Sequence, residues 1–307
     1  MKFQVKVPAT SANIGAGFDV MGMALDIYNI FEVEEIETSS EVIFDGFELE
    51  YSNKDNIFYK SMILLLDKYE YKYNGFRISL KENNIPIARG LGSSSSCIVG
   101  GLVSANKILG NKFTREELVK VATDIEGHPD NVSPAILGGL VVTVVEEDKL
   151  YYNRVDISED IVFSCYIPNF KISTEKAREI LPKEIKLSDG IYNVGHSMLT
   201  LLAFINKDYD LLKISCRDKF HQDYRGSLID DYENILCKFN SYGALGTFIS
   251  GSGPTIIGIF NSKDIENTIN MKRDMLALKN EVKFINLIVD NKGAQVEERW
   301  LWWVVSY

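Results

Sequence analysis

The chain has 307 residues, of which 46% are hydrophobic and 25% are charged. These proportions are ordinary for a globular protein, and they exclude disorder, collagen and coiled coil as descriptions of the whole chain. The length predicts about two domains, large enough to fold without disulfide or metal crosslinks. The formal net charge of −10 disfavours binding to nucleic acid and to anionic membranes. A small polyanion would therefore need a local anchor, such as a helix N-terminus, a metal ion or a few placed cations.

The residue usage predicts a cytoplasmic protein with reduced thiols. The N-terminal residues lack the apolar segment of a signal peptide, and the longest nearly apolar stretch, 135–145, is too short to span a bilayer. Three scattered histidines and the absence of HExxH indicate no recognisable zinc site. No CxxC pair occurs among the four cysteines, which are Cys97, Cys165, Cys216 and Cys237.

Strands and helices alternate irregularly along the chain, which favours an α+β fold over a doubly wound parallel sheet. A polar stretch between two apolar strands places the domain boundary near residue 155. Hydrophobic periodicity predicts, in chain order, strands over 3–7 and 24–37, a helix over 56–73, a strand over 76–80, a Gly/Ser loop over 85–96, helices up to about 109 and over 114–126, and a strand over 141–145. Beyond the boundary it predicts strands over 161–167, 247–250, 255–260 and 282–289, with helices over 174–181 and 190–206 between them.

The strongest local signal is the string IPIARGLGSSSSCIVGG at 85–101. Gly90 and Gly92 permit positive φ and let another group approach the backbone. The serines at 93–96 can cap the following helix, whose free N–H groups and positive dipole end suit a phosphate. Neither the Walker A string nor GxGxxG is present. On these residues alone, a purely structural turn stays an alternative.

A second signal is DIEGHPDNV at 124–132. Thr114 and Glu117 form a capping box for the preceding helix, and Gly127 is its expected C-cap. A carboxylate at a helix C-terminus is unfavourable unless a cation lies nearby, so Glu126 is a candidate Mg²⁺ ligand. The alternative is a solvated surface carboxylate. Asp130 or Asn131 is expected to cap the next helix.

Two further strings carry glycines beside polar residues. In PATSANIGAGFD at 8–19, the loop bears Asn13 and Asp19, which are either substrate contacts or turn formers. By itself, FISGSGPTIIG at 248–258 predicts a hairpin. Arg178 and Arg225 stand near predicted helices. Each is either a ligand contact or a solvated surface residue.

The last residues, WLWWVVSY, contain all three tryptophans. A packing segment is the favoured interpretation. A membrane or partner anchor is the alternative, and the lack of a basic flank weakens it.

Taken together, PATSANIGAGFD, PIARGLGSSSS, EGHPDN and SGSGPT, in this order, resemble the GHMP small-molecule kinases. The first and third strings resemble the homoserine-phosphorylating branch of that family. The resemblance runs from about residue 3 to about residue 296. It implies an N-terminal domain over 1–155 like ribosomal protein S5 domain 2 and a ferredoxin-like C-terminal domain over 156–296. The apolar tail over 297–307 lies beyond it.

The resemblance also implies an activity: phosphorylation of the side-chain hydroxyl of L-homoserine by ATP and Mg²⁺, in threonine biosynthesis. A homodimer is compatible with the family. Ser94 and Glu126 match the Mg²⁺ ligands, and Thr174, Arg178 and Asn131 match catalytic positions. The residues that match the substrate side are Asn13, Asp19, His128, Asp130, Arg178 and Arg225. The ATP phosphate loop is matched by Pro86, Ile87, Ala88, Arg89, Gly90, Leu91, Gly92, Ser93, Ser94, Ser95 and Ser96.

The chemistry of a zwitterionic substrate agrees with this assignment. Asp19 and Asp130 can bind an ammonium group, and Arg178 and Arg225 can bind a carboxylate. Mevalonate lacks the ammonium group and would leave the two carboxylates unpaired. Two alternatives stay open: a GHMP kinase for a different small alcohol, and a nucleotide or metabolite sensor without turnover. The sensor predicts damage to the Gly/Ser loop or to Glu126, and the sequence contains none.

Overall fold

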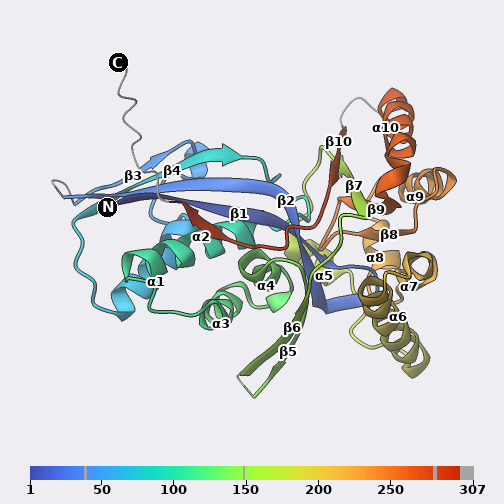
Figure 1. Ribbon diagram of the computed structural model, residues 1–307, viewed down its shortest axis with the longest axis horizontal. Coiled ribbons are helices and arrows are strands. Elements are labelled where there is room, and N and C mark those ends of the chain that lie inside the picture. Colours follow the sequence, from blue (N-terminus) through green and yellow to red (C-terminus); the bar gives the residue numbers. More distant parts are fainter. Residues whose placement is uncertain (38–39, 148, 279–281, 298–307) are drawn as a thin grey trace.

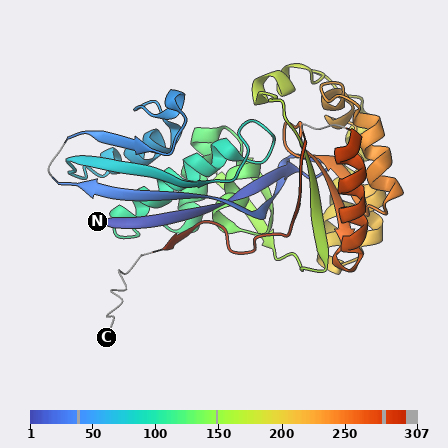
Figure 2. The same cartoon turned by 90° about the horizontal axis from the view of Figure 1, so that it is seen from above.

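A computed structural model describes residues 1–37, 40–147, 149–278 and 282–297, which form two lobes side by side (Figures 1 and 2). The first lobe is built on a seven-stranded sheet in the order β11-β1-β2-β4-β3, with β5 paired to β2 and β6 to β5. Its strands are β1 (Lys2–Asn13), β2 (Gly17–Ile36), β3 (Val42–Asp45), β4 (Gly75–Asn83), β5 (Leu140–Glu146), β6 (Lys149–Val155) and β11 (Gln295–Glu297). Its helices are α1 (Ile57–Lys68), α2 (Ser93–Ile108), α3 (Arg115–Glu126) and α4 (Pro129–Leu137).

The second lobe is a four-stranded antiparallel sheet in the order β10-β7-β9-β8. Its strands are β7 (Ile161–Pro168), β8 (Gly246–Ile249), β9 (Ile256–Asn261) and β10 (Val282–Leu287). Its helices are α5 (Thr174–Glu179), α6 (Leu187–Asn206), α7 (Leu212–Ser215), α8 (Gln222–Gly226), α9 (Tyr232–Ser241) and α10 (Ile265–Leu278). With α9 and α10 as the crossover helices, both packed on one face of the sheet, the sequence β7-α9-β8-β9-α10-β10 is the ferredoxin-like βαββαβ arrangement.

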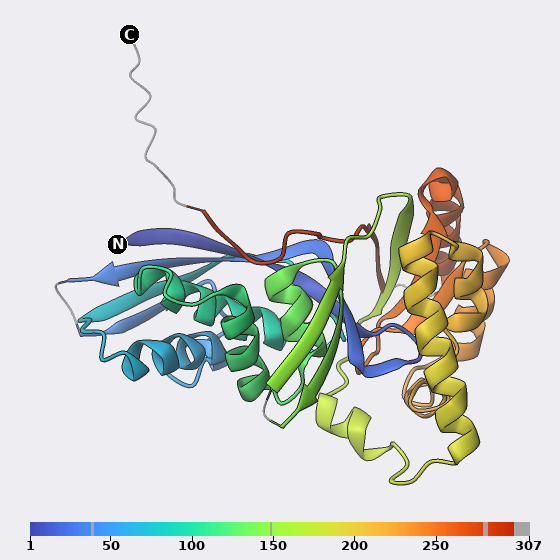
Figure 3. The same cartoon turned by 60° about the horizontal axis from the view of Figure 1, so that its bottom comes forward.

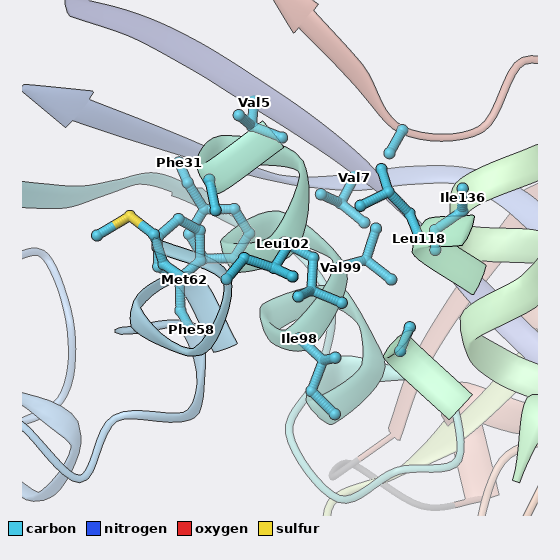
Figure 4. Close-up of a cluster of buried hydrophobic side chains, with 14 of the residues drawn as sticks. Val5, Val7, Phe31, Phe58, Met62, Ile98, Val99, Leu102, Leu118 and Ile136 are labelled. Carbon is cyan, nitrogen blue, oxygen red and sulfur yellow. The ribbon is translucent and has the colours of Figure 1, made fainter. Parts of the chain in front are cut away.

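Helices α1 and α2 pack together and against the sheet to form the core of the first lobe (Figure 4). The two helices approach closely at Gly101, where a Cβ would lie 2.2 Å from the carbonyl oxygen of Phe58. The labelled side chains in Figure 4 come from β1, β2 and all four helices: Val5, Val7, Phe31, Phe58, Met62, Ile98, Val99, Leu102, Leu118 and Ile136.

In the second lobe, alternate residues of β9 serve two separate cores. Ile257 and Ile259 pack in the cluster that contains Phe204 of α6, whereas Ile256 and Phe260 pack on the opposite side. The first of these clusters also includes residues of β1, β2 and the loop between them. The two lobes therefore share one apolar core at their junction.

The α+β fold class is confirmed, with differences in the extent of elements. The predicted strand at 24–37 is the second part of β2, which begins at Gly17, and the helix predicted over 56–73 ends at Lys68, before Glu70 with φ 51°. The polar stretch between the predicted domains contains β6, which pairs with β5 along its whole length and whose residues alternate in burial. The boundary near residue 155 stays a prediction, and β11 pairs with β1 in the first sheet.

Two details of the chain ends and helices complete the description. Except for Glu297, the tryptophan-rich tail lies outside the described residues. Over the described part of the chain, none of the helices has both the length and the apolar character needed to cross a bilayer.

We expect Gly101→Ala to destabilise the protein by about 2 kcal/mol or more, because the added methyl group meets the backbone of Phe58 and forces α1 and α2 apart. Gly190→Ala in α6 is the matched control. Its Cβ would have only an ordinary contact of 3.8 Å with the side chain of Ile185, so it should stabilise by about 0.5–1 kcal/mol. Urea unfolding of both variants measures the difference. Equal stability of the two would contradict the helix packing described here.

Candidate active site

A cavity of about 450 Å³ lies at the junction of the lobes, and residues from all four sequence motifs line it. Of the residues expected in the site, Pro86, Leu91 and Ser96 are not among the lining residues. Leu91 is fully buried in the shared core, and the hydroxyl of Ser96 donates to the Ser93 carbonyl. The remaining expected residues line the cavity: Asn13, Asp19, Ile87, Ala88, Arg89, Gly90, Gly92, Ser93, Ser94, Ser95, Glu126, His128, Asp130, Asn131, Thr174, Arg178 and Arg225.

The Gly/Ser loop adopts a backbone that only glycine accommodates at two positions. Gly90 has φ 76° and Gly92 has φ 71°. A Cβ on Gly92 would lie 2.0 Å from Oγ1 of Thr10, and one on Gly90 would lie 2.2 Å from the carbonyl oxygen of Ser250. The groups that approach these glycines thus belong to β1 and to the SGSGP turn of the second lobe, residues 250–254. Their close contact fixes the position of the loop.

The start of α2 presents unused hydrogen-bond donors to the cavity. Gly92 is the N-cap, and no serine side chain caps the helix, so the predicted serine cap is wrong; these serines form the first turn instead. Among the described residues, the backbone N–H groups of 90–95 donate to no protein acceptor. Together with the dipole of a 16-residue helix, these donors suit an anion such as phosphate.

Glu126 faces these serines from the end of α3. The capping box at Thr114 and the C-cap at Gly127 are both confirmed, and they fix where α3 begins and ends. The carboxylate of Glu126 accepts hydrogen bonds from Ser95 at 2.9 Å and from Ser94 at 3.5 Å. Burial raises the pKa of Glu126, so the group is not a freely solvated carboxylate.

The donor set at Glu126 suits Mg²⁺, which prefers hard oxygen ligands and is usually bound by one or two carboxylates together with substrate phosphates. Across the described residues, no group of three or more His, Cys, Asp and Glu could hold a metal ion by itself.

Three polar residues at the start of α4 form one hydrogen-bonded group. His128 is the N-cap and Pro129 the first helical residue, so the prediction that Asp130 or Asn131 caps this helix is wrong. Nδ1 of His128 lies 2.7 Å from Oδ1 of the buried Asp130, and this bond raises the pKa of His128. Asn131 donates to Asp130 at 3.3 Å and accepts from Thr10 at 2.8 Å.

Asp19 and Arg178 form a two-pronged ion pair that joins the lobes. The guanidinium donates to the two carboxylate oxygens at 2.9 and 2.8 Å, and Asp19 raises the pKa of Arg178. Asn13 holds Asp19 from the other side, because its side-chain oxygen accepts the Asp19 N–H at 3.1 Å. Asp19 has φ 58°, a conformation that aspartate tolerates better than most residues.

Arg225 is only 2% exposed, and it donates to the carbonyls of Ala177 at 3.2 Å and Gly251 at 2.8 Å. Burial, and then the charge of Arg178, lower the pKa of Arg225 to about 10. Both guanidinium groups lie over the ring of Phe18, at 5.2 Å for Arg225 and 5.9 Å for Arg178.

A buried network behind Arg225 was missed by sequence reasoning. Asp218 accepts the backbone N–H groups of Phe220, His221 and Gln222, at 2.7–3.0 Å, and the side chain of Asn193 at 2.6 Å. His221 in turn contacts the carbonyl of Gly15. An aspartate two to four residues before the accepted N–H groups is the spacing of a local side-chain-to-backbone turn, which is the signal that could have found it.

The apolar wall of the cavity was also missed, because its residues other than Cys97 lie outside the four strings. It comes from the segment before and at the start of α1, from β4 and from α2, and consists of Phe47, Tyr51, Ile57, Leu80 and Cys97.

Comparison with known proteins shows the family to which the chain belongs. The family models for the GHMP kinases N terminal domain and the GHMP kinases C terminal match residues 56–139 and 200–272. A homoserine kinase of Clostridium beijerinckii is 49% identical over 96% of this chain and 98% of its own length. One of Clostridium botulinum is 47% identical, with 95% and 97% covered. The chain belongs to the homoserine kinase family of the GHMP kinases.

Solved structures agree with this family. The crystal structure of homoserine kinase from Cytophaga hutchinsonii has a TM-score of 0.85 at 27% identity, covering 96% of this chain and 97% of that one. A mevalonate kinase structure, with a TM-score of 0.70 at 15% identity and coverage of 94% and 99%, shares the fold. The GHMP kinase fold expected from the motifs is thereby confirmed.

We expect Glu126→Gln to stabilise the metal-free protein above about pH 5. A buried carboxylate with a raised pKa binds its proton more tightly in the folded state, so stability is lost as pH rises from the unfolded value of 4.5 through the folded pKa. Glutamine avoids this loss. Tm measured from pH 4 to 8 with a chelator should show an advantage of about 2 °C at pH 7 that disappears near pH 4. Asp124→Asn, which removes an exposed carboxylate from the same helix, is the control of equal charge change; the same gain in Tm from both variants would contradict the burial effect.

Proposed function

We propose that the protein transfers the γ-phosphoryl group of ATP to the side-chain hydroxyl of L-homoserine, giving O-phospho-L-homoserine and ADP. The pathway is threonine biosynthesis, the compartment is the cytoplasm, and the assembly is a homodimer. The observation that carries the proposal is one cavity holding the free N–H groups at the start of α2 together with paired carboxylates and arginines. The family membership gives the same reaction.

Substrate recognition follows from the exchange of ion pairs. Asp19 and Arg178 neutralise each other across the cavity. The ammonium group of homoserine would take the place of Arg178 beside Asp19 and Asp130, while the carboxylate binds Arg178 and Arg225. The charges then stay balanced. A substrate with a carboxylate and no ammonium group would draw Arg178 away from Asp19 and bring that carboxylate no positive charge in exchange.

The nucleotide would bind with its phosphates at the start of α2 and its base against the apolar wall. The N–H groups of 90–95 and the helix dipole supply the positive potential that a chain of net charge −10 otherwise lacks. Ser94 and Glu126 would hold Mg²⁺, which neutralises phosphate charge when bound.

The reaction needs positioning more than covalent chemistry. The homoserine hydroxyl oxygen forms a bond to the γ-phosphorus as the bond to the β-phosphate oxygen breaks, and the hydroxyl proton leaves to solvent or phosphate oxygen without a dedicated base. Arg178 and the loop N–H groups stabilise the charge on the transferring group. Thr174, at the first position of α5, and Asn131, held by Thr10, would orient the attacking hydroxyl.

We expect Arg178→Ala to lower kcat/KM for L-homoserine about 10²–10³-fold, because it removes a donor to both substrate and transition state. Arg178→Lys keeps the charge but not the two-pronged geometry, so it should recover only part of the activity. ADP release with L-homoserine, mevalonate and L-serine in parallel measures both points. Turnover with mevalonate alone would favour a kinase for a different alcohol. Nucleotide binding without turnover in any well would favour the sensor.

We expect Glu126→Gln to raise the Mg²⁺ concentration needed for half-maximal turnover by about tenfold, because a neutral amide is a poorer Mg²⁺ ligand. Titration of Mg²⁺ at fixed ATP measures the shift, with Asp124→Asn as the control of equal charge change. An unaltered Mg²⁺ dependence would remove Glu126 from the metal site.

A further inference from the structure

Helix α6 is apolar on two opposite sides. Its inner side packs in the shared core through residues such as Ala203 and Phe204, and its polar Asn193 and Thr200 are buried on the same side. Its outer side carries a second line of large apolar residues, which we call the α6 stripe. The stripe consists of Leu187, Ile191, Val194, Met198, Leu202 and Ile205.

The α6 stripe is exposed along its whole length. Leu187 is 81% exposed, Ile191 67% and Met198 62%. The spacings of three and four residues place all six side chains within one narrow sector of the helix. In Figures 1 and 3, α6 runs along the outside of the second lobe, and no other described element covers its outer side.

The exposed apolar surface here is larger than a monomer ordinarily leaves in water. Four further exposed residues flank the stripe. Together the ten residues expose on the order of 1,000 Å², whereas a typical monomer's largest patch is about 300–600 Å² and a stable interface buries about 800 Å² per partner. The flanking residues are Ile185, Leu199, Leu211 and Ile214.

The charges favour a second copy of this chain as the partner. Residues 190–206 contain no Asp, Glu, Lys or Arg, so two chains of net charge −10 can approach here without like charges facing each other. At both ends of α6 the charges balance: Lys183, Glu184, Lys186 and Asp189 sum to zero before and at its start, as do Lys207, Asp208, Asp210 and Lys213 after it. An antiparallel pair therefore brings no net like charge together at either end.

We propose that the α6 stripe is the homodimer interface, with α6 of one protomer packed antiparallel on α6 of the other about a twofold axis near Gly195. A Cβ added to Gly195 would have no atom within 4 Å, so this position is open. Gly195 lies beside the stripe, between Ile191 and Met198. A small residue at the crossing lets the two helices approach closely. The proposal specifies the surface of the homodimer proposed above, and it does not depend on the phosphoryl transfer.

The chain's own tail is the main competitor for the stripe. β11, the last described element, pairs with β1 in the first lobe, across the molecule from α6 (Figure 3). Removal of residues 298–307 separates the two possibilities, because it should leave a dimer intact.

The first test measures mass by analytical ultracentrifugation of the full chain and of Met198→Lys, which places two like charges near the twofold axis. The full chain should sediment at twice its 34.7 kDa. The variant should sediment as a monomer at about 1 µM, corresponding to a dimer Kd raised at least 100-fold. Ile269→Lys on α10, which replaces a residue 57% exposed, is the matched control and should stay dimeric. Far-UV circular dichroism checks that each variant is folded.

The second test is a crosslink that only the proposed geometry permits. Gly195→Cys in a Cys237→Ser background, which removes the exposed native thiol, should form a disulfide-linked dimer under mild oxidation, since helices crossing here bring the two Cα atoms within reach. Ile269→Cys in the same background should not. Homoserine-dependent ADP release is measured on the same samples, so loss of turnover and loss of the dimer are separate results.

Three outcomes would overturn the proposal. One is a monomeric full chain. Another is a full chain that becomes dimeric only when residues 298–307 are removed, which would assign the stripe to the tail. The third is a monomer that co-sediments with neutral phosphatidylcholine vesicles through the stripe, which would assign it to a lipid surface.

Discussion

The site depends on a backbone contact between the Gly/Ser loop of the first lobe and the SGSGP turn of the second. The Gly251 N–H donates to Ala12 in β1, and the Gly251 carbonyl accepts from both Asn13 and Arg225. The hydroxyl of Ser250 donates to the Gly90 carbonyl. The close contacts leave no room for side chains at the glycines. The same loop conformation therefore joins the two lobes and leaves the N–H groups at the start of α2 without protein acceptors.

This contact explains how an acidic protein can be suited to a nucleotide and an amino acid together. The positive potential comes from backbone groups and from two arginines, one paired with Asp19 and the other buried with a lowered pKa. Because these groups are held by carbonyls and by each other, little reorganisation is needed when a charged ligand arrives, which is the usual condition for electrostatic catalysis. The overall charge of the chain has little influence inside such a cavity.

Motifs predicted the site better than they predicted its local structure. The four strings meet in one cavity because each chemistry-bearing residue sits next to a glycine or cap that fixes its loop. The helix caps of α2 and α4 were predicted wrongly, since Thr10 crowds Gly92 and Pro129 begins α4 one residue after His128. The Asp218 network and the apolar wall could not be found, because their residues come from segments brought together only by tertiary packing. Likewise, two apolar sides on α6 do not reveal from sequence which one is buried.

Helix α6 connects the substrate side of the cavity to the outer surface. On its inner side Asn193 donates to Asp218, Asp218 accepts the first N–H group of α8, and α8 carries Arg225. A rotation of α6 by one residue would withdraw Asn193 and remove one of the buried hydrogen bonds that Asp218 accepts, which is costly. Packing the α6 stripe against a second copy would oppose the same rotation from outside. The helix that presents the proposed interface is therefore also the one whose orientation keeps the buried arginine in place.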